Sequence, residues 1–189
     1  FRIALTPIFI YLLFSVSLYS NFYALFIFIL ASATDAFDGY YARKYNIETE
    51  IGNFLDPLAD KILVSSAFIS FYLLGLIDAW MVAIILLRDI FITCLRMFMK
   101  SNGQSLRTSR LAKSKTAVQL ILIIFILVFL AIEDKGAINF SFATSFILKH
   151  NIVYNSTFIV SIFTFYTGFR YIQNNYDLLK KIVLNENSI

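Results

Sequence analysis

The chain has 189 residues, of which 59% are hydrophobic and 15% charged, with a formal net charge of +4. A soluble domain averages about 25% charged residues, so this composition argues against an ordinary soluble protein and favours a polytopic membrane protein. No Gly/Ser linker, charge block or repeat divides the sequence, and we expect one all-α membrane domain over residues 1–189. The single cysteine, Cys94, excludes an internal disulfide and is expected to be buried. The single histidine, His150, lies in a polar stretch and argues against a His-based site.

Six stretches are apolar over about the 20 residues that a helix needs to cross a bilayer. They are residues 3–19, 21–42, 56–76, 79–99, 114–132 and 153–172. We expect helices because lipid offers no partner to open backbone groups. The first stretch is followed by further spans and by no cleavage site, so it is interpreted as a membrane helix and not as a signal peptide. Residues 133–152 are expected to form a loop, and they carry no motif.

The basic residues are unevenly distributed over the two sides of such a six-helix arrangement. Fourteen of the 16 Lys and Arg fall on the side of both termini, and only Lys135 and Lys149 fall on the other. Positively charged loops stay in the cytoplasm, so residues 35–61 are expected to face it. We therefore expect a multi-pass protein of a bacterial-type inner membrane, with the polar site on the cytoplasmic side.

Four aspartates lie in the second and third spans, namely Asp35, Asp38, Asp56 and Asp60. Asp35 is about 21 Å along a helix that starts near residue 21, short of the ~30 Å hydrocarbon thickness. A carboxylate at that depth costs at least ~2.5 kcal/mol, so a functional site facing a polar cavity is the default interpretation. The spacings of three and four residues put each pair on one helix face. Two such faces can present four carboxylates to one cavity.

Four carboxylates in one cavity would repel one another, and two divalent cations would balance their charge. Hard oxygen ligands without His or Cys favour Mg²⁺ or Mn²⁺ over zinc. Because Mg²⁺ usually also binds substrate phosphates, a phosphorylated substrate is expected. The alternative is structural, in which the buried acids form ion pairs with Arg43, Lys44 and Lys61.

Small and basic residues accompany these acids. Gly39, Ala42 and Gly52 either allow close helix packing or leave room for a flat ligand such as a nucleotide base, and spacing alone leaves both open. Arg43 either pairs with a diphosphate or marks the membrane interface. Pro57 directly follows Asp56 and is expected in the first turn of a helix.

The spacing Asp35-x2-Asp38-Gly39-x2-Ala42-Arg43-x8-Gly52-x3-Asp56-x3-Asp60 resembles the signature of the CDP-alcohol phosphatidyltransferases without a departure. The resemblance implies a six-helix membrane enzyme, a homodimer, that displaces CMP from a CDP-linked lipid with an alcohol. It implies two Mg²⁺ or Mn²⁺ ions at the positions of Asp35, Asp38 and Asp56, with Asp60 close by. The position of Asp60 is also that of the base that deprotonates the acceptor. Gly39, Ala42, Arg43 and Gly52 match positions that line the CDP pocket.

A second, basic cluster spans residues 86–119 and bears on the acceptor. Topology and attraction to anionic lipid explain part of it, but not Arg88 within an apolar span. A basic pocket suits an acceptor that carries its own phosphate. The predicted acceptor-phosphate ligands are Arg88, Arg110, Lys113 and Lys115. The predicted partners are a lipid bilayer, CDP-diacylglycerol and glycerol 3-phosphate, and no nucleic acid.

The arrangement also resembles the branch of the family that takes glycerol 3-phosphate as acceptor. Three features carry this likeness: the start "FRIALTPIFI" with Arg2, the pair Arg88-Asp89 in the fourth span, and the run 113–116 at the fifth. It covers most of residues 1–132. A sister enzyme that makes cardiolipin or phosphatidylinositol phosphate is the alternative, followed by an intramembrane prenyltransferase, which would release pyrophosphate, and an ion or metal transporter.

Overall fold

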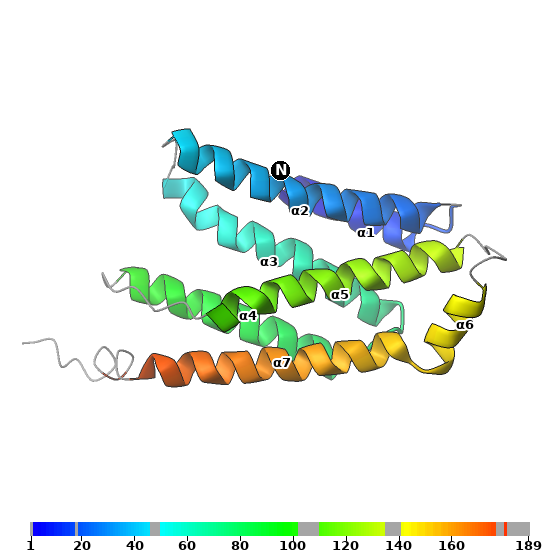
Figure 1. Cartoon of the computed structure of the whole chain (residues 1–189). Coiled ribbons are helices and arrows are strands. Elements are labelled where there is room, and N and C mark those ends of the chain that lie inside the picture. Colours follow the sequence, from blue (N-terminus) through cyan, green and yellow to red (C-terminus); the bar gives the residue numbers. More distant parts are fainter. Residues whose placement is uncertain are drawn as a thin grey trace, which may run out of the picture.

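A computed structural model describes the backbone of residues 2–17, 19–45, 50–101, 110–134, 141–176 and 180. Side chains are described for the same residues except 35–60, 100–101, 110–113, 134, 141 and 143. These residues form seven α-helices and no strand (Figure 1). The helices are α1 (Arg2–Phe14), α2 (Ser20–Tyr45), α3 (Glu50–Leu73), α4 (Ala79–Ser101), α5 (Arg110–Asp134), α6 (Ser141–Lys149) and α7 (Ile152–Asn174). The predicted all-α class is confirmed.

The long helices run back and forth between two ends of a bundle, and the short helix α6 lies at one end of it (Figure 1). The other end gathers the C-terminus of α2, the N-terminus of α3 and the C-termini of α4 and α7. We call it the site end, because the aspartate helices α2 and α3 are joined there. The opposite end carries the turns from α1 to α2 and from α3 to α4.

Two stretches among the described residues, Ser114–Glu133 and Ile152–Asn174, are long and apolar enough to cross a membrane. Three shorter apolar helical stretches are Arg2–Phe14, Ser20–Thr34 and Lys61–Leu73. The expected arrangement of six spans thus stays a prediction.

Three local expectations were wrong. The stretch 133–152 is not simply a loop, because it contains the helix α6, which is too short to give the signal of a membrane span. Pro57 does not lie in a first turn, because α3 already begins at Glu50. Cys94 is exposed on α4 and not buried. The prediction failed because the outer surface of α4 is itself apolar, with Phe91 and Phe98 exposed there as well.

The turns at the opposite end have identifiable causes. Gly75 follows α3 with a φ of 73°, a left-handed conformation that glycine adopts without strain. Asp78 precedes α4, and its Oδ2 accepts hydrogen bonds from Trp80 Nε1 at 3.1 Å and from Tyr154 Oη at 2.9 Å. One carboxylate therefore ties the start of α4 to the start of α7.

The buried core is aromatic and aliphatic and draws on all of the long helices. Phe9 of α1 and Phe28 of α2 are fully buried, with ring centroids 5.6 Å apart. The fully buried Phe68 and Phe71 add a T-shaped pair from α3. Large apolar side chains also lie on the outside, among them Phe91, Ile121, Phe165 and Phe169. Apolar surface on this scale is typical of a protein that contacts lipid or another chain.

Candidate active site

The helices α2 and α3 carry the predicted metal and base positions. The backbone of α2 contains Asp35 and Asp38, and that of α3 contains Asp56 and Asp60. The side chains of these four residues lie outside the described part of the structure, as do those of Gly39, Ala42, Arg43 and Gly52. The helices themselves confirm that each aspartate pair has helical spacing.

The two aspartate pairs lie at matching distances from the site end. Asp35 is ten residues before Tyr45, the last residue of α2, and Asp60 is ten residues after Glu50, the first residue of α3. At about 1.5 Å per residue both backbone positions are about 15 Å along their helices from this shared end. Only four residues connect the two helices, so the ends themselves are close in space. The fold thus brings two sequence-distant pairs to one level of the bundle.

The aspartate positions continue the buried stripes of their helices. In α2 the fully buried Phe28 and Ala31 are followed, at steps of four and three residues, by the positions 35 and 38. In α3 the positions 56 and 60 precede Val64 and Phe68, which are 4% and 0% exposed, at steps of four. Residues at such steps share one side of a helix.

Three basic residues from three helices meet around one buried carboxylate, that of Asp89. Asp89 lies on α4 and is 3% exposed. Its Oδ1 accepts hydrogen bonds from Lys115 Nζ of α5 and from Arg88 Nη1, the latter at 3.3 Å. Lys61 Nζ of α3 lies 3.7 Å from Asp89 Oδ2. We call Lys61, Arg88, Asp89 and Lys115 the Asp89 cluster.

The Asp89 cluster joins the two regions that the sequence singles out. Lys61 directly follows Asp60, and consecutive Cα atoms are about 3.8 Å apart. The basic residues of α4 and α5 are therefore brought beside the aspartate helix α3. The sequence suggested a basic pocket beside the aspartates from charge alone. The contact from Lys61 to Asp89 shows that α3 and α4 meet at this point.

The charge of the Asp89 cluster is not balanced within it. Lys61, Arg88 and Lys115 all form ion pairs with the one carboxylate, so among the described side chains three positive charges share one negative charge. Lys115 is only 1% exposed, and burial of an uncompensated cation is costly. Arg88 Nε is also buried, and it has no hydrogen-bond partner among the described residues. A cluster with surplus positive charge and an unused donor suits an anionic ligand.

The helix α7 contributes contacts to α4 that were not predicted. Arg88 Nη2 donates to Thr167 Oγ1 at 3.4 Å, and Arg96 Nε donates to Tyr171 Oη at 3.1 Å. The Arg96 guanidinium carbon also lies 5.2 Å from the centroid of the Tyr171 ring. A signal for this side of α7 was present in the sequence. The buried residues Thr157, Ser161, Thr164, Gly168 and Tyr171 recur at steps of three or four.

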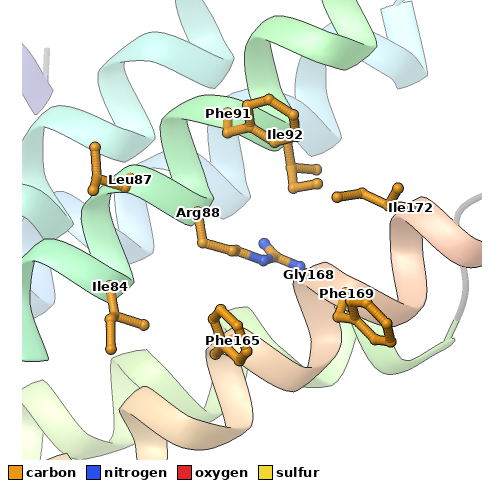
Figure 2. A pocket seen from close by; sticks show the side chains of 9 residues that line it. All are labelled: Ile84, Leu87, Arg88, Phe91, Ile92, Phe165, Gly168, Phe169 and Ile172. Carbon is orange, nitrogen blue, oxygen red and sulfur yellow. The ribbon is translucent and has the colours of Figure 1, made fainter.

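A groove of about 410 Å³ runs between α4 and α7 (Figure 2). Its lining is apolar apart from Arg88: Ile84, Leu87, Arg88, Phe91, Ile92, Phe165, Gly168, Phe169 and Ile172. Figure 2 shows Arg88 extending from α4 toward Gly168 on α7.

The remaining predicted acceptor ligands lie at the start of α5. Arg110 is the first residue of that helix, and Lys113 follows within its first turn. Their side chains lie outside the described residues. The free N–H groups at a helix N-terminus favour anions, so the backbone there has the polarity that a phosphate needs. No group of three His, Cys, Asp or Glu that could hold a metal occurs among the described side chains, which do not include the four aspartates.

Comparison with known proteins agrees with this arrangement. A family profile of the CDP-alcohol phosphatidyltransferases matches residues 1–167. Three relatives carry the name CDP-diacylglycerol–glycerol-3-phosphate 3-phosphatidyltransferase. The one from Bacillus subtilis (strain 168) is 36% identical over 163 residues, which are 82% of this chain and 74% of the relative. The one from Rickettsia bellii (strain RML369-C) is 38% identical over 136 residues, covering 72% and 73%. The one from Escherichia coli (strain K12) is 36% identical over 133 residues, covering 67% and 72%. The chain belongs to the CDP-alcohol phosphatidyltransferase family.

Proposed function

We propose that this protein transfers the phosphatidyl group of CDP-diacylglycerol to glycerol 3-phosphate, giving phosphatidylglycerol phosphate and CMP. One observation carries the proposal: the Asp89 cluster, with its surplus positive charge, is joined through Lys61 to the helix that holds Asp56 and Asp60. A place for an anionic acceptor thus lies beside the acidic signature of a CDP-lipid enzyme. The names of the relatives support the same reaction.

The donor side of the site is assigned to α2 and α3. Asp35, Asp38, Asp56 and Asp60 would hold two Mg²⁺ or Mn²⁺ ions. The four residues fit such ions, because carboxylates at helical spacing on two joined helices form a hard, all-oxygen ligand set. When bound, the cations neutralise the diphosphate and make it open to attack.

The nucleotide is assigned to residues between the two aspartate pairs. Gly39, Ala42 and Gly52 leave room for the cytidine, and Arg43 neutralises part of the diphosphate charge. All four positions lie within α2 or α3, toward the site end from Asp35 and Asp60. The CMP moiety therefore enters from that end, while the lipid tails stay in the bilayer.

The acceptor's phosphate is assigned to cations of α4 and α5. Arg88 and Lys115 belong to the Asp89 cluster, and Arg110 and Lys113 lie at the N-terminus of α5. Asp89 pairs with Lys61, Arg88 and Lys115 but carries only one negative charge against their three. The remaining charge attracts a dianionic phosphate, and Arg adds directed hydrogen bonds to its oxygens.

Asp60 acts as the general base of the transfer. It takes the proton of the 1-hydroxyl of glycerol 3-phosphate as that oxygen attacks the phosphorus of the phosphatidyl group. A new oxygen–phosphorus bond forms, and the bond from that phosphorus to the bridging oxygen breaks. The bridging oxygen leaves with CMP and keeps the electron pair. Lys61, which contacts Asp89, is the next residue after this base in α3, so the backbone of the base lies close to the Asp89 cluster.

The protein is proposed to cross the membrane six times through α1–α5 and α7, with the site end in the cytoplasm. The outward apolar side chains of these helices support contact with lipid. The excess of Lys and Arg at the site end supports its cytoplasmic location. The bacterial relatives agree with an inner-membrane protein, and the family resemblance supports a homodimer.

An assay of the acceptor tests the proposal. Detergent-purified protein with Mg²⁺ is given labelled CDP-diacylglycerol and one acceptor at a time: glycerol 3-phosphate, glycerol, serine, inositol phosphate or phosphatidylglycerol. CMP and phosphatidylglycerol phosphate are expected with glycerol 3-phosphate, and far less product with unphosphorylated glycerol. Product from inositol phosphate or phosphatidylglycerol, and none from glycerol 3-phosphate, would show that the chain is a sister enzyme.

A further inference from the structure

We propose that Thr167 and Gly168 of α7 are positioning residues, which hold the Arg88 side chain in place and thereby set the affinity for the phosphorylated acceptor. The inference rests on the proposed function and adds a role for a helix that lies outside the acidic signature. The family profile ends at residue 167, so Gly168 and Tyr171 follow the matched part of the chain.

Gly168 leaves the room that the Arg88 side chain occupies. A Cβ atom at this position would lie 2.8 Å from Arg88 Cγ and 3.3 Å from Arg88 Nε. A carbon at 2.8 Å is inside van der Waals contact, so one of the two groups has to move. Cγ is near the base of the side chain, and the guanidinium beyond it is bound at both Nη1 and Nη2. A small rotation of the side-chain tip therefore cannot relieve the contact.

Thr167 fixes the far end of the same side chain. Its hydroxyl donates to the Thr164 carbonyl oxygen at 2.9 Å, so the proton is already used within α7. The Thr167 oxygen can then only accept, and it accepts from Arg88 Nη2 at 3.4 Å. A guanidinium needs such an acceptor, and α7 supplies it from a buried residue that is 3% exposed.

The contacts of Arg88 with α7 determine how Arg88 meets the Asp89 cluster. With Nη2 on Thr167, Arg88 Nη1 reaches Asp89 Oδ1 and shares it with Lys115. If Arg88 were displaced, the cluster would lose one of its three cations, and its surplus positive charge would fall. The acceptor's phosphate depends on that surplus, whereas the CDP-lipid binds at α2 and α3. Disturbing the contacts of Arg88 with α7 should therefore weaken the binding of the acceptor and leave the binding of the CDP-lipid largely unchanged.

The first test is Gly168→Ala, assayed for both substrates with the full-length protein. The KM for glycerol 3-phosphate should rise about tenfold or more, as expected when a charged hydrogen bond is misaligned, while the KM for CDP-diacylglycerol changes less than about twofold. Thermal stability should fall only slightly, because the higher helix propensity of Ala offsets part of the cost of moving the Arg88 side chain. If both KM values rise together, or only kcat falls, Gly168 serves general packing and the proposal is wrong.

A second test removes the hydroxyl group and does not depend on the first variant folding. Thr167→Val should raise the KM for glycerol 3-phosphate, and Thr167→Ser, which keeps the acceptor oxygen, should restore it. Thr164→Val is the matched control, because Thr164 is buried one turn away and its Oγ1 has no hydrogen-bond partner in the part of the chain that the structure describes. Equal KM values for Thr167→Val and Thr164→Val would overturn the inference. An unmodified protein that makes no CMP from glycerol 3-phosphate would instead overturn the proposed function.

Discussion

The Asp89 carboxylate forms ion pairs with basic residues of three helices, α3, α4 and α5. Removing its negative charge tests how much these pairs contribute to stability. Asp89→Asn keeps the shape of the side chain and one acceptor oxygen but removes the negative charge. Lys115 and Asp89 are 1% and 3% exposed, so the change leaves a cation buried without its counter-charge. Breaking a buried ion pair from one side costs roughly 3–5 kcal/mol. Because Asn still accepts one hydrogen bond, we expect the lower end, about 3 kcal/mol.

The assay for Asp89→Asn is thermal unfolding in detergent, with a carboxylate elsewhere as the control. A loss of about 3 kcal/mol corresponds to a fall in Tm of roughly 6–12 °C for a chain of this length. Glu133→Gln, at an exposed position near the end of α5, should change stability by less than about 0.5 kcal/mol. Adding Lys115→Met to Asp89→Asn should recover part of the loss, since it removes the unpaired cation. If Asp89→Asn shifts Tm no more than Glu133→Gln, the charge account of the cluster is refuted.

Three further predictions concern the acids, the metals and the opposite end of the bundle. Asp60→Asn should abolish turnover while CDP-lipid binding, measured by titration, largely survives, whereas Asp38→Ala should lose metal and lipid headgroup binding together; full activity of Asp60→Asn would remove its role as base. EDTA should stop CMP release, and Mg²⁺ or Mn²⁺ should restore it more fully than Zn²⁺, since the proposed ligands are all oxygens; activity that survives exhaustive chelation would contradict the metal assignment. Asp78→Ala should lower stability by only about 1 kcal/mol, because its bonds to Trp80 and Tyr154 are exposed, and should leave both KM values unchanged; a changed KM for glycerol 3-phosphate would contradict that separation.

The sequence predicts those features that depend on spacing along one helix. The steps from Asp35 to Asp38 and from Asp56 to Asp60 place each pair on one helix side without knowledge of the fold. The helical state of both segments follows the prediction. Arg88 and Asp89 could also be singled out from the sequence, because charged residues are rare in an apolar stretch.

The partners across helices could not be predicted in the same way. Lys113 and Lys115 are two residues apart and point to nearly opposite sides of α5. Which of them meets Asp89 depends on the rotation of α5 against α4, which no local pattern specifies. The structure shows the contact between Lys115 and Asp89. The contacts of Thr167 and Tyr171 with arginines more than seventy residues earlier depend on the same kind of packing.

Burial of single side chains was also hard to predict from the sequence, as Cys94 shows. In a water-soluble helix the apolar side marks the core, but a helix in lipid is apolar on both sides. Cys94 therefore resembles a core residue by sequence and is exposed in the structure. The polar residues of α7 give the better signal, because Thr157, Ser161 and Thr164 are fully buried and mark the inward side.

The adjacency of Asp60 and Lys61 in α3 has a consequence for how the enzyme keeps its two substrates aligned. Asp60, the proposed base, and Lys61, which contacts Asp89, are joined by one peptide bond, so the distance between their backbones is fixed. Any rotation or sliding of α3 would carry both by the same amount. In the proposed reaction, a movement of α3 would therefore shift the base and the Lys61 contact with Asp89 together.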